Sequence, residues 1–250
     1  VYRPLYLNKA PLVEMSRRSA ELTKYAGNAF LATKITFINE IADLCEKTGA
    51  DVQDVARGIG LDNRIGPKFL HAGPGYGGSC FPKDTLALLK TAQDFEAPQR
   101  IVEAVVEVNE MRKRAMGRKI IEALGGTVQG KKIAILGLTF KPNTDDMRDS
   151  PAIAIIKTLQ EAGADIHAYD PQGEEQARLV LDDVTYCTGP YEAMEGAAGL
   201  AIVTEWDEFR ALDLAKAKGL LGAPVLVDLR NVYERGDAER AGFAYWGIGR

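Results

Sequence analysis

The sequence predicts an α/β fold in which an all-helical module precedes a Rossmann-like, doubly wound parallel sheet. In the first half, apolar residues recur at spacings of three and four, the period of a buried helix face. In the second half, short aliphatic runs alternate with helical segments, which is typical of parallel βα units. The character changes at Gly125-Gly126, so we expect two domains, residues 1–125 and 126–250.

The longest periodic segment runs from about Ala20 to Lys47 and predicts one helix of many turns. Ser19 or Arg18 lies near its expected start, and Thr48-Gly49 is expected to stop it. Its near-continuous hydrophobicity suggests burial on more than one side, as in a domain-spanning or dimer-forming helix. Cys45 falls on the apolar stripe and is interpreted as a core thiol.

Shorter elements complete the helical module. A short helix is expected over residues 51–58, with Asp51 at its start, and residues 60–67 are expected to be a loop. Two further helices are expected, one that follows Cys80 and continues to about Asp94, and one from Gln99 to about Leu124.

The second half carries the predicted sheet. Strands are expected over residues 131–137, 165–171, 200–204, 225–228 and 243–246, and a helix over 151–162, with Ser150 as its cap and Gly163 as its stop. Doubly wound sheets bind ligands outside the carboxyl ends of their strands. The residues that follow the strands are therefore candidates for a site: Phe140, Lys141, Asp170, Glu205 and Arg230.

The first strand-to-helix turn, residues 137–143, lacks the Gly-x-Gly-x-x-Gly pattern that binds a dinucleotide pyrophosphate. Two cations on this connection could bind a phosphate: Lys141 as a point charge and Arg148 through bidentate hydrogen bonds from its guanidinium. A solvated basic loop is the alternative, because three nearby carboxylates could neutralise them: Asp145, Asp146 and Asp149.

Composition excludes several classes of protein. The net charge is −4, from 31 basic and 35 acidic residues that are well mixed, so nothing suggests a nucleic-acid surface. Charges interrupt every apolar stretch before it could span a bilayer. Three cysteines far apart argue against a disulfide framework and for a reducing, cytoplasmic location, and no cysteine or histidine spacing suits a metal. The chain opens on Val1 without an initiator Met, so we expect a fragment.

Cys80 gives the strongest chemical signal. It follows the glycine-rich run Gly73-Pro74-Gly75-Tyr76-Gly77-Gly78, whose backbone is free to turn sharply and to approach a ligand. It precedes a helix whose N-terminus favours a thiolate, with the cation of Lys83 nearby and the carboxylate of Asp84 one turn on. These features are compatible with a covalent active site, but equally with a surface loop carrying an incidental cysteine.

A second polar feature lies on the long helix. Lys24 and Asn28 are four residues apart and share a face, amid small apolar neighbours. Polar groups on a mostly buried helix usually have a polar task, so this pair is a further candidate for the site.

Taken together, three blocks resemble the UDP-glucose/GDP-mannose dehydrogenase family. They are residues 19–40, with Lys24 and Asn28; the Cys80 loop; and residues 137–151, with Lys141 and Arg148. The resemblance covers almost the whole chain. The family's N-terminal Rossmann domain has no counterpart here, so the chain resembles the central dimerising helices and the UDP-binding domain, and we expect it to be inactive alone.

The resemblance implies an NAD-dependent, two-step oxidation of a nucleotide sugar. It implies that Cys80 captures the aldehyde as a thiohemiacetal that is oxidised to a thioester, that Asp84 assists its hydrolysis, and that Lys24 and Asn28 stabilise the developing oxyanion. It implies NAD contacts at Lys83 and Arg148. It implies substrate contacts at Lys24, Arg64, Phe69, Leu70, His71, Ala72, Gly73, Tyr76, Gly77, Phe140, Lys141 and Arg230.

The residues around Cys80 resemble the UDP-glucose branch, which implies UDP-glucose as substrate and UDP-glucuronate as product. GDP-mannose and other UDP-hexoses stay open. The resemblance also implies a homodimer through the long helix, with Arg64 reaching the neighbouring subunit's substrate. Two alternatives remain: a non-catalytic nucleotide-sugar-binding or dimerisation module, and a 6-phosphogluconate-type dehydrogenase, which lacks the cysteine loop and a second α/β layer.

Overall fold

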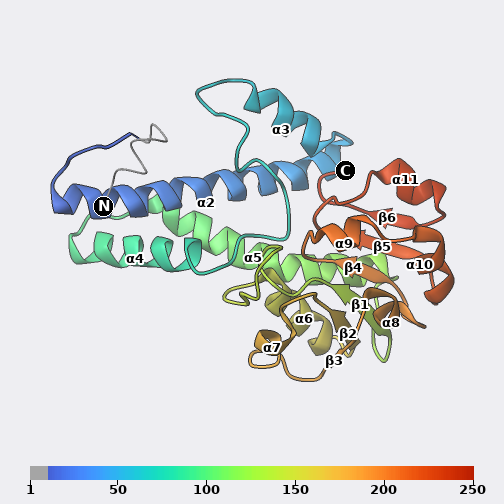
Figure 1. Ribbon diagram of the computed structural model, residues 1–250. Coiled ribbons are helices and arrows are strands. Elements are labelled where there is room, and N and C mark those ends of the chain that lie inside the picture. The colour runs from blue at the N-terminus through green and yellow to red at the C-terminus, as the bar shows by residue number, and fades with distance from the viewer. Residues whose placement is uncertain (1–10) are drawn as a thin grey trace.

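The computed structural model describes residues 11–250, and Figure 1 labels their elements. The long helix α2 spans Arg17–Thr48 and begins three residues before the expected Ala20, because the side chain of Ser16 accepts a hydrogen bond from the Ser19 amide. It ends as predicted, at Gly49, whose φ of 75° suits glycine. The expected beginning of the helical module, residues 1–10, lies outside the described residues.

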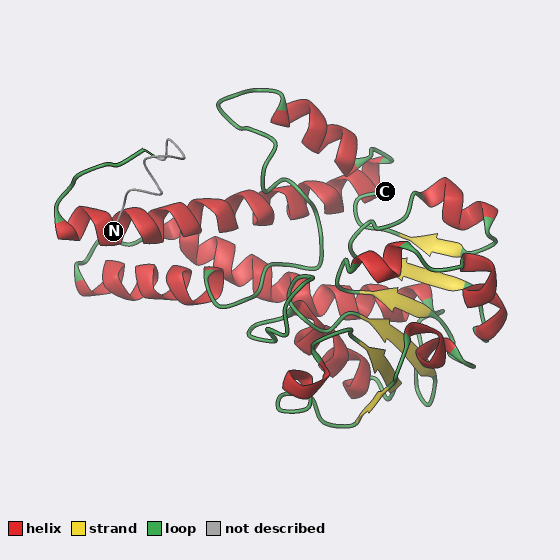
Figure 2. Cartoon of the chain, in the orientation of Figure 1, coloured by secondary structure: helices red, strands yellow, loops and turns green. Residues whose placement is uncertain are grey.

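Three more helices follow α2. They are α3 (Val52–Gly60), α4 (Phe81–Asp94) and α5 (Arg100–Ala123). Asp51 caps α3 by accepting a hydrogen bond from Gln53, as its position predicts. Helices α2, α4 and α5 pack along one another on one side of the molecule, while α3 lies beside the C-terminal end of α2 (Figures 1 and 2). The sequence predicted all four elements within a few residues.

Six parallel strands form one sheet in the order β3-β2-β1-β4-β5-β6, the order of a doubly wound Rossmann-type layer. The predicted α/β class is therefore confirmed. The strands are β1 (Lys132–Leu136), β2 (Asp165–Tyr169), β3 (Val184–Tyr186), β4 (Leu200–Ile202), β5 (Val225–Asp228) and β6 (Ala244–Trp246). The intervening helices are α6 (Pro151–Glu161), α7 (Glu174–Ala177), α8 (Pro190–Met194), α9 (Asp207–Arg210), α10 (Leu214–Leu220) and α11 (Arg235–Arg240).

Alternate side chains of β1 face two different cores. Ile133 and Ile135 pack with residues of α5 and α6, whereas Ala134 and Leu136 pack with residues of α8, α10 and α11. This is the two-residue period of a strand that is buried on both faces. It explains why β1 is an uninterrupted aliphatic run in the sequence.

The larger core joins the helical part to the sheet. Ile38 and Ala42 of α2 belong to the same buried cluster as Ile133 of β1 and Ile155 of α6. Helix α5 packs along α6, so it serves as one of the covering helices of the sheet (Figure 1). The division into domains at residue 125 stays a prediction, since this core crosses it.

Cys45 is buried in the core, as expected, and Cys187 is buried as well; burial is the largest cause that raises the pKa of each thiol. The ring nitrogen Nδ1 of His167 lies 4.0 Å from the Cys187 sulfur. Between residues 11 and 250, no helix has the length and apolar character needed to cross a membrane.

Candidate active site

A cavity of about 780 Å³ lies where the helical part meets the carboxyl ends of the strands. Its lining joins the loop before α4 to the connection after β1 and to the ends of β4 and β5. Nine of the candidate site residues named from the sequence line it: Phe69, His71, Tyr76, Gly77, Cys80, Phe140, Lys141, Glu205 and Arg230.

Cys80 is the residue that precedes α4, as predicted, and its thiol is exposed at the cavity. Its sulfur lies 3.8 Å from the Ser79 hydroxyl, and its side chain makes no capping hydrogen bond to α4. Asp84 lies one turn along the same helix, with its amide donating to the Cys80 carbonyl over 2.9 Å. The thiol is therefore free to meet a molecule in the cavity.

The glycines of the loop approach protein backbone and side chains. A Cβ on Gly77 would stand 2.2 Å from the Asp149 carbonyl oxygen, and one on Gly78 would stand 2.6 Å from the Phe140 ring. The Gly78 amide donates to the Arg148 carbonyl over 2.8 Å. The expectation that these glycines make room for a ligand is thus refined, because at Gly77 and Gly78 the close approach is to the connection after β1.

Aromatic side chains form part of the wall. The rings of Phe69 and Tyr76 pack edge-on against Phe81, with centroids 6.0 Å and 5.9 Å away. Phe69 has a φ of 64°, a left-handed conformation that is costly for a bulky residue. Such strain is often stored at ligand sites.

Lys24, Asn28, Lys83 and Asp84 form a polar cluster beside Cys80 and are absent from the cavity lining. Lys24 Nζ donates to Asn28 Oδ1 over 3.3 Å, and Asn28 Nδ2 donates to Asp84 Oδ2 over 2.5 Å. Lys83 pairs with the other oxygen of Asp84. The hydrogen bond from Lys83 is the main cause that lowers the pKa of Asp84, and the bond from Asn28 adds to it.

The two cations after β1 have different surroundings. Arg148 forms bonds of 2.9 Å and 2.8 Å with the Asp146 carboxylate, and this pairing lowers the pKa of Asp146. Lys141 instead lies over the Phe140 ring, 5.3 Å from its centroid. Arg148 is therefore neutralised by a nearby carboxylate, as the alternative of a solvated basic loop predicts. Among the described residues no carboxylate forms an ion pair with Lys141.

Arg230 is held from several sides. Its Nε donates to the Val203 carbonyl over 2.8 Å and lies 3.0 Å from Glu205, and its Nη2 donates to the Phe140 carbonyl over 3.2 Å. Asp228, at the end of β5, accepts from the Arg230 amide over 3.1 Å. The guanidinium thus spans the ends of β4 and β5 at the cavity.

Other predicted site residues lie elsewhere. Leu70 is a core residue with 4% of its surface exposed, and Gly73 is buried, so neither residue lines the cavity. Ala72 also lies outside the lining. Arg64 is exposed and pairs with Asp62, which is compatible with the expected reach toward another subunit but places it away from its own cavity.

Sequence reasoning missed part of the lining. The additional residues are Ile35, Lys68, Gly75, Gly78, Ser79, Phe81, Thr144 and Asp146. A signal existed for Ser79 and Phe81, which flank the cysteine, and for Gly75 and Gly78, which belong to the glycine-rich run. Ile35 carries none, because it belongs to the apolar period of α2 like any core residue.

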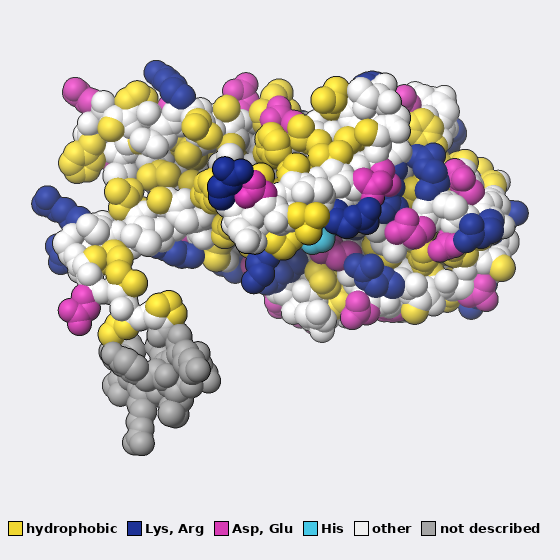
Figure 3. Space-filling model, turned by 90° about the horizontal axis from the view of Figure 1, so that it is seen from above, with side chains coloured by type: hydrophobic (Ala, Val, Ile, Leu, Met, Phe, Trp, Pro, Cys, Tyr) yellow, Lys and Arg dark blue, Asp and Glu magenta, His cyan; other side chains and the backbone are white. Residues whose placement is uncertain are grey.

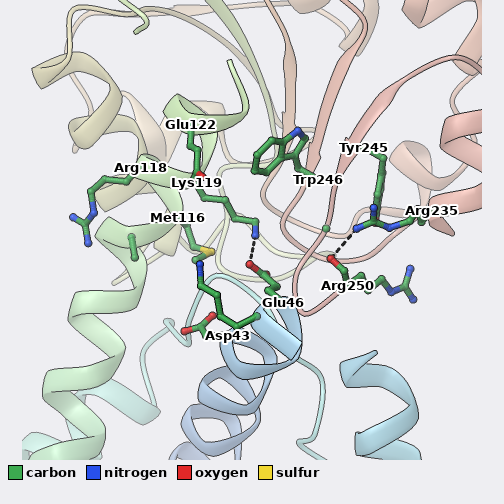
Figure 4. A pocket seen from close by; sticks show the side chains of 13 residues that line it. Asp43, Glu46, Met116, Arg118, Lys119, Glu122, Arg235, Tyr245, Trp246 and Arg250 are labelled. Carbon is green, nitrogen blue, oxygen red and sulfur yellow. Dashed lines mark hydrogen bonds and ion pairs between the residues drawn. The ribbon is translucent and has the colours of Figure 1, made fainter. Parts of the chain in front are cut away.

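A second cavity of about 720 Å³ lies between the C-terminal parts of α2 and α5 and strand β6. Figure 4 shows Lys119 turned toward Glu46 and Arg250 beside Arg235, with Trp246 above them. The Lys119–Glu46 ion pair is 2.7 Å long, and Asp43 pairs with Arg112 over 2.8 Å. No cysteine is among its lining residues, so the cavity at Cys80 is the stronger candidate for chemistry.

Two family models match this chain. The central domain of the UDP-glucose/GDP-mannose dehydrogenase family matches residues 18–111, and the UDP binding domain of the same family matches residues 134–235. The chain belongs to the UDP-glucose/GDP-mannose dehydrogenase family. The first match includes the Cys80 loop, and the second includes Lys141, Arg148 and Arg230.

Curated relatives of the UDP-glucose/GDP-mannose dehydrogenase family agree with these matches. A UDP-glucose 6-dehydrogenase of Rhizobium meliloti (strain 1021) is 66% identical over 250 residues, which are 100% of this chain and 57% of the relative. Another, of Bacillus subtilis (strain 168), is 49% identical and covers 96% of this chain and 52% of the relative. The chain therefore spans just over half the length of these relatives.

Solved structures of the same kind share the fold. A UDP-glucose dehydrogenase from the archaeon Pyrobaculum islandicum superposes with a TM-score of 0.85 at 39% identity, over 96% of this chain and 53% of that one. An NDP-N-acetyl-D-galactosaminuronic acid dehydrogenase from Methanosarcina mazei Go1 gives 0.83 at 30% identity, over 94% of this chain and 52% of that one.

In this dehydrogenase-family chain, an acid at the carboxyl end of the sheet holds the chain's own backbone. At the end of β2, Asp170 Oδ2 accepts hydrogen bonds from the amides of Leu138 and Thr139, from the Thr139 hydroxyl and from Trp206 Nε1. In dinucleotide-binding Rossmann domains this strand end carries the acid that meets the ribose. Here its bonds hold the turn after β1.

Proposed function

We propose that this chain is the nucleotide-sugar-binding and thiol-bearing part of an NAD-dependent enzyme that oxidises UDP-glucose to UDP-glucuronate. The observation that carries the proposal is the exposed Cys80 at the start of α4, opening on a cavity that Lys141 and Arg230 also line. Family membership and the UDP-glucose 6-dehydrogenases among the relatives supply the reaction and the substrate.

The nucleotide is held from the sheet side of the cavity. Lys141 presents an ammonium without a carboxylate partner among the described residues, which suits a diphosphate. Arg230 reaches the same cavity, and its guanidinium is oriented by the Val203 carbonyl and the Glu205 carboxylate. The sugar then points toward Cys80, past the Phe69 and Tyr76 rings.

Cys80 acts on the aldehyde produced by the first oxidation. Its sulfur adds to the carbonyl carbon, forming a C–S bond and a negatively charged oxygen, the thiohemiacetal state. Loss of hydride from that carbon leaves a thioester on Cys80. Water then attacks the thioester, the C–S bond breaks, and the free thiol and the uronate result. NAD supplies the chemistry of accepting one hydride in each oxidation.

The polar cluster beside Cys80 serves these steps. Lys24 and the Asn28 amide stabilise the negative oxygen as it develops. Asp84, whose pKa is lowered mainly by Lys83, is ionised at neutral pH and orients the water that attacks the thioester. We place Lys83 and Arg148 at the edge of NAD, and we propose that the rest of its site belongs to the part of the relatives that this chain does not span.

We further propose a homodimer through α2. Four large apolar side chains lie exposed along this helix at spacings of seven and eight residues: Leu22, Phe30, Phe37 and Leu44. Figure 3 views the molecule from that side. In this dimer Arg64, which is exposed after α3, reaches the partner's substrate. The three free cysteines fit a reducing, cytoplasmic location.

The test uses the full-length enzyme that contains this chain. With UDP-glucose we expect reduction of two NAD per uronate, and slower turnover with GDP-mannose. Cys80→Ser is expected to abolish formation of the acid. The covalent role of Cys80 falls if the serine variant makes glucuronate at the unsubstituted rate.

A second candidate is a binding module, favoured by the incomplete dinucleotide site. On this reading residues 1–250 alone bind the nucleotide sugar without turning it over. Calorimetric titration with UDP-glucose and with GDP-mannose measures this directly, and the absence of heat with both would exclude it. Reduction of NAD by residues 1–250 alone would show instead that the chain has a complete site.

A further inference from the structure

The side chain of Asn109, on α5, binds the cavity loop as a peptide group would. Its Oδ1 accepts from the Tyr76 amide over 2.9 Å, and its Nδ2 donates to the Tyr76 carbonyl over 3.1 Å. Asn109 is only 2% exposed, so neither bond is exchanged for a bond to water. The pair fixes both the place and the orientation of the backbone at Tyr76.

A second attachment holds the loop at Gly73, three residues earlier. The Gly73 amide donates to Asn39 Oδ1 over 2.8 Å, and its carbonyl accepts from Arg112 Nε over 2.7 Å. Arg112 is itself fixed, because its Nη1 donates to the Asn39 carbonyl and to Asp43. Helices α2 and α5 therefore both hold this residue.

The loop between the two attachments lies directly against α5. Gly75 has a φ of 115°, and a Cβ there would stand 3.0 Å from Asn109 Oδ1, so only glycine permits this approach. Beyond Tyr76 the chain turns to the other wall, where the Gly78 amide donates to the Arg148 carbonyl. The loop is thus fixed between the helices and the connection after β1, and it leads from there into Cys80.

We propose that Asn109 and Arg112 are positioning residues, which set the place of the Cys80 loop relative to the nucleotide sugar. The proposal rests on the function proposed above and assigns a role to two side chains that do not line the cavity. They act through the loop: Asn109 orients Tyr76, whose ring forms the wall, and Arg112 orients Gly73, which lies beside Arg230. Displacing a reacting group by about 1 Å costs roughly 100-fold in rate.

These contacts differ from ordinary packing because hydrogen bonds are directional and fix the orientation of the loop backbone. Apolar side chains would fill the same space but would leave the loop backbone free to rotate. Buried polar groups that are bound in pairs select one arrangement. Among the described residues, buried Arg112 Nη2 and Asn39 Nδ2 have no hydrogen-bond partner, so the arrangement is kept although two donors go unmet there.

The experiment compares three variants of the full-length enzyme. Asn109→Leu removes both bonds to Tyr76, Asn109→Asp keeps the acceptor and loses the donor, and Arg112→Lys loses the fork that joins Gly73 to Asn39. Ile120→Ala is the matched control, because Ile120 is equally buried on α5 but packs in the core away from the loop. For each we measure kcat and KM for UDP-glucose, amide hydrogen exchange by mass spectrometry, and the rate at which iodoacetamide alkylates Cys80.

We expect Asn109→Leu to lower kcat by roughly 10- to 100-fold, with Asn109→Asp between it and the unsubstituted enzyme. Exchange should quicken in residues 73–80 and stay unchanged in the sheet, and the alkylation rate of Cys80 should shift. Ile120→Ala should quicken exchange in the core and keep kcat. Unchanged kcat and KM in Asn109→Leu, or an equal fall in Ile120→Ala, would overturn the positioning role.

Failure of the proposed function would be visible separately. In that case the unsubstituted enzyme would not reduce NAD with any nucleotide sugar. The local exchange and the alkylation of Cys80 would still decide the positioning role, because neither depends on turnover. A global rise in exchange in Asn109→Leu and Arg112→Lys alike would show a merely structural role and refute the proposal.

Discussion

The side-chain amide of Asn28, on α2, donates a 2.5 Å hydrogen bond to the carboxylate of Asp84, on α4, and so joins the two helices beside Cys80. Both side chains are buried, with 7% and 2% of their surface exposed. Asn28 Oδ1 accepts a second hydrogen bond, from Lys24, and the other oxygen of Asp84 forms an ion pair with Lys83. The ionised form of this buried carboxylate is stabilised by two side-chain donors, Lys83 and Asn28, whose hydrogen bonds lower the pKa of Asp84.

The first prediction concerns this contact. Asp84→Asn removes the charge that Asn28 and Lys83 share and leaves two amides facing each other. We expect a loss of about 2 kcal/mol in the free energy of unfolding, typical of a hydrogen bond to a buried charge. In the full-length enzyme we also expect slower release of the acid. Chemical denaturation and single-turnover assays measure the two effects.

Asp94→Asn is the control for this change. Asp94 ends the same helix but is mostly exposed, and its ion pair with Lys90 is of the surface kind that contributes little. We expect it to be nearly neutral in both assays. Equal stability losses in Asp84→Asn and Asp94→Asn would show that the contact with Asn28 contributes nothing.

The second prediction is a pH dependence of stability. The pKa of Asp84 is lowered in the folded chain from 3.8, mainly by Lys83, and that of Asp146 is lowered mainly by Arg148. A carboxyl group with a depressed folded pKa contributes stability that is present above its unfolded pKa and is lost as the pH falls through the folded value. We therefore expect the denaturation midpoint to fall as the pH drops below about 3.8, and this fall to be smaller in Asp84→Asn. Curves that run parallel from about pH 7 to about pH 3 would contradict the assignment.

The local physics of the chain made most of the fold predictable. Strand β1 is buried on both faces, and helix α4 begins at Cys80-Phe81-Pro82, so each has a signal in its own residues. The start of α2 was misplaced because the Ser16 cap competes with Ser19, another good capping residue.

The site was predictable only where its residues lie near one another in sequence or at strand ends. Asn109 and Arg112 are polar positions on a periodic helix, where such residues usually face solvent. Their bonds to Tyr76 and Gly73 span 33 and 39 residues, and nothing local indicates them. The pairing of Asp146 with Arg148 is local, but the sequence alone did not decide between Arg148 and Lys141 as its partner.

The third prediction concerns Asp170. Its Oδ2 accepts from Leu138, Thr139 and Trp206, and its Oδ1 accepts from Gln172 and Gly173. An asparagine can offer only one oxygen, so Asp170→Asn leaves one set of buried donors unmet. We expect a loss of about 2–3 kcal/mol in the free energy of unfolding, measured by denaturant titration. Asp207→Asn, at a side chain 97% exposed, should change it by less than about 0.5 kcal/mol. A similar small loss in Asp170→Asn would mean that water can replace these bonds.

The fourth prediction tests the close approach at Gly77. A Cβ there would stand 2.2 Å from the Asp149 carbonyl oxygen, which belongs to the backbone and cannot turn away. We expect Gly77→Ala to displace the loop from the connection after β1, to destabilise the chain, and to weaken binding of UDP-glucose in calorimetry. Gly58→Ala, in helix α3 with nothing within 4 Å of its Cβ, should instead stabilise the helix by up to about 1 kcal/mol. Unchanged binding in Gly77→Ala would show that this part of the loop is not held in place.

The last prediction concerns the outer face of α2. Phe30 and Phe37 are 65% and 49% exposed, on a helix whose other side packs on α4 and α5. If this face joins two subunits, a charge there must be buried without a partner, which costs several kcal/mol. We therefore expect Phe37→Glu to convert the full-length enzyme from a dimer to a monomer in light scattering, and to lower activity if the partner's Arg64 completes the site. Leu179→Glu, at an equally apolar but distant surface residue that is 76% exposed, should leave the dimer intact. A Phe37→Glu enzyme that stays dimeric would place the subunit contact on another surface.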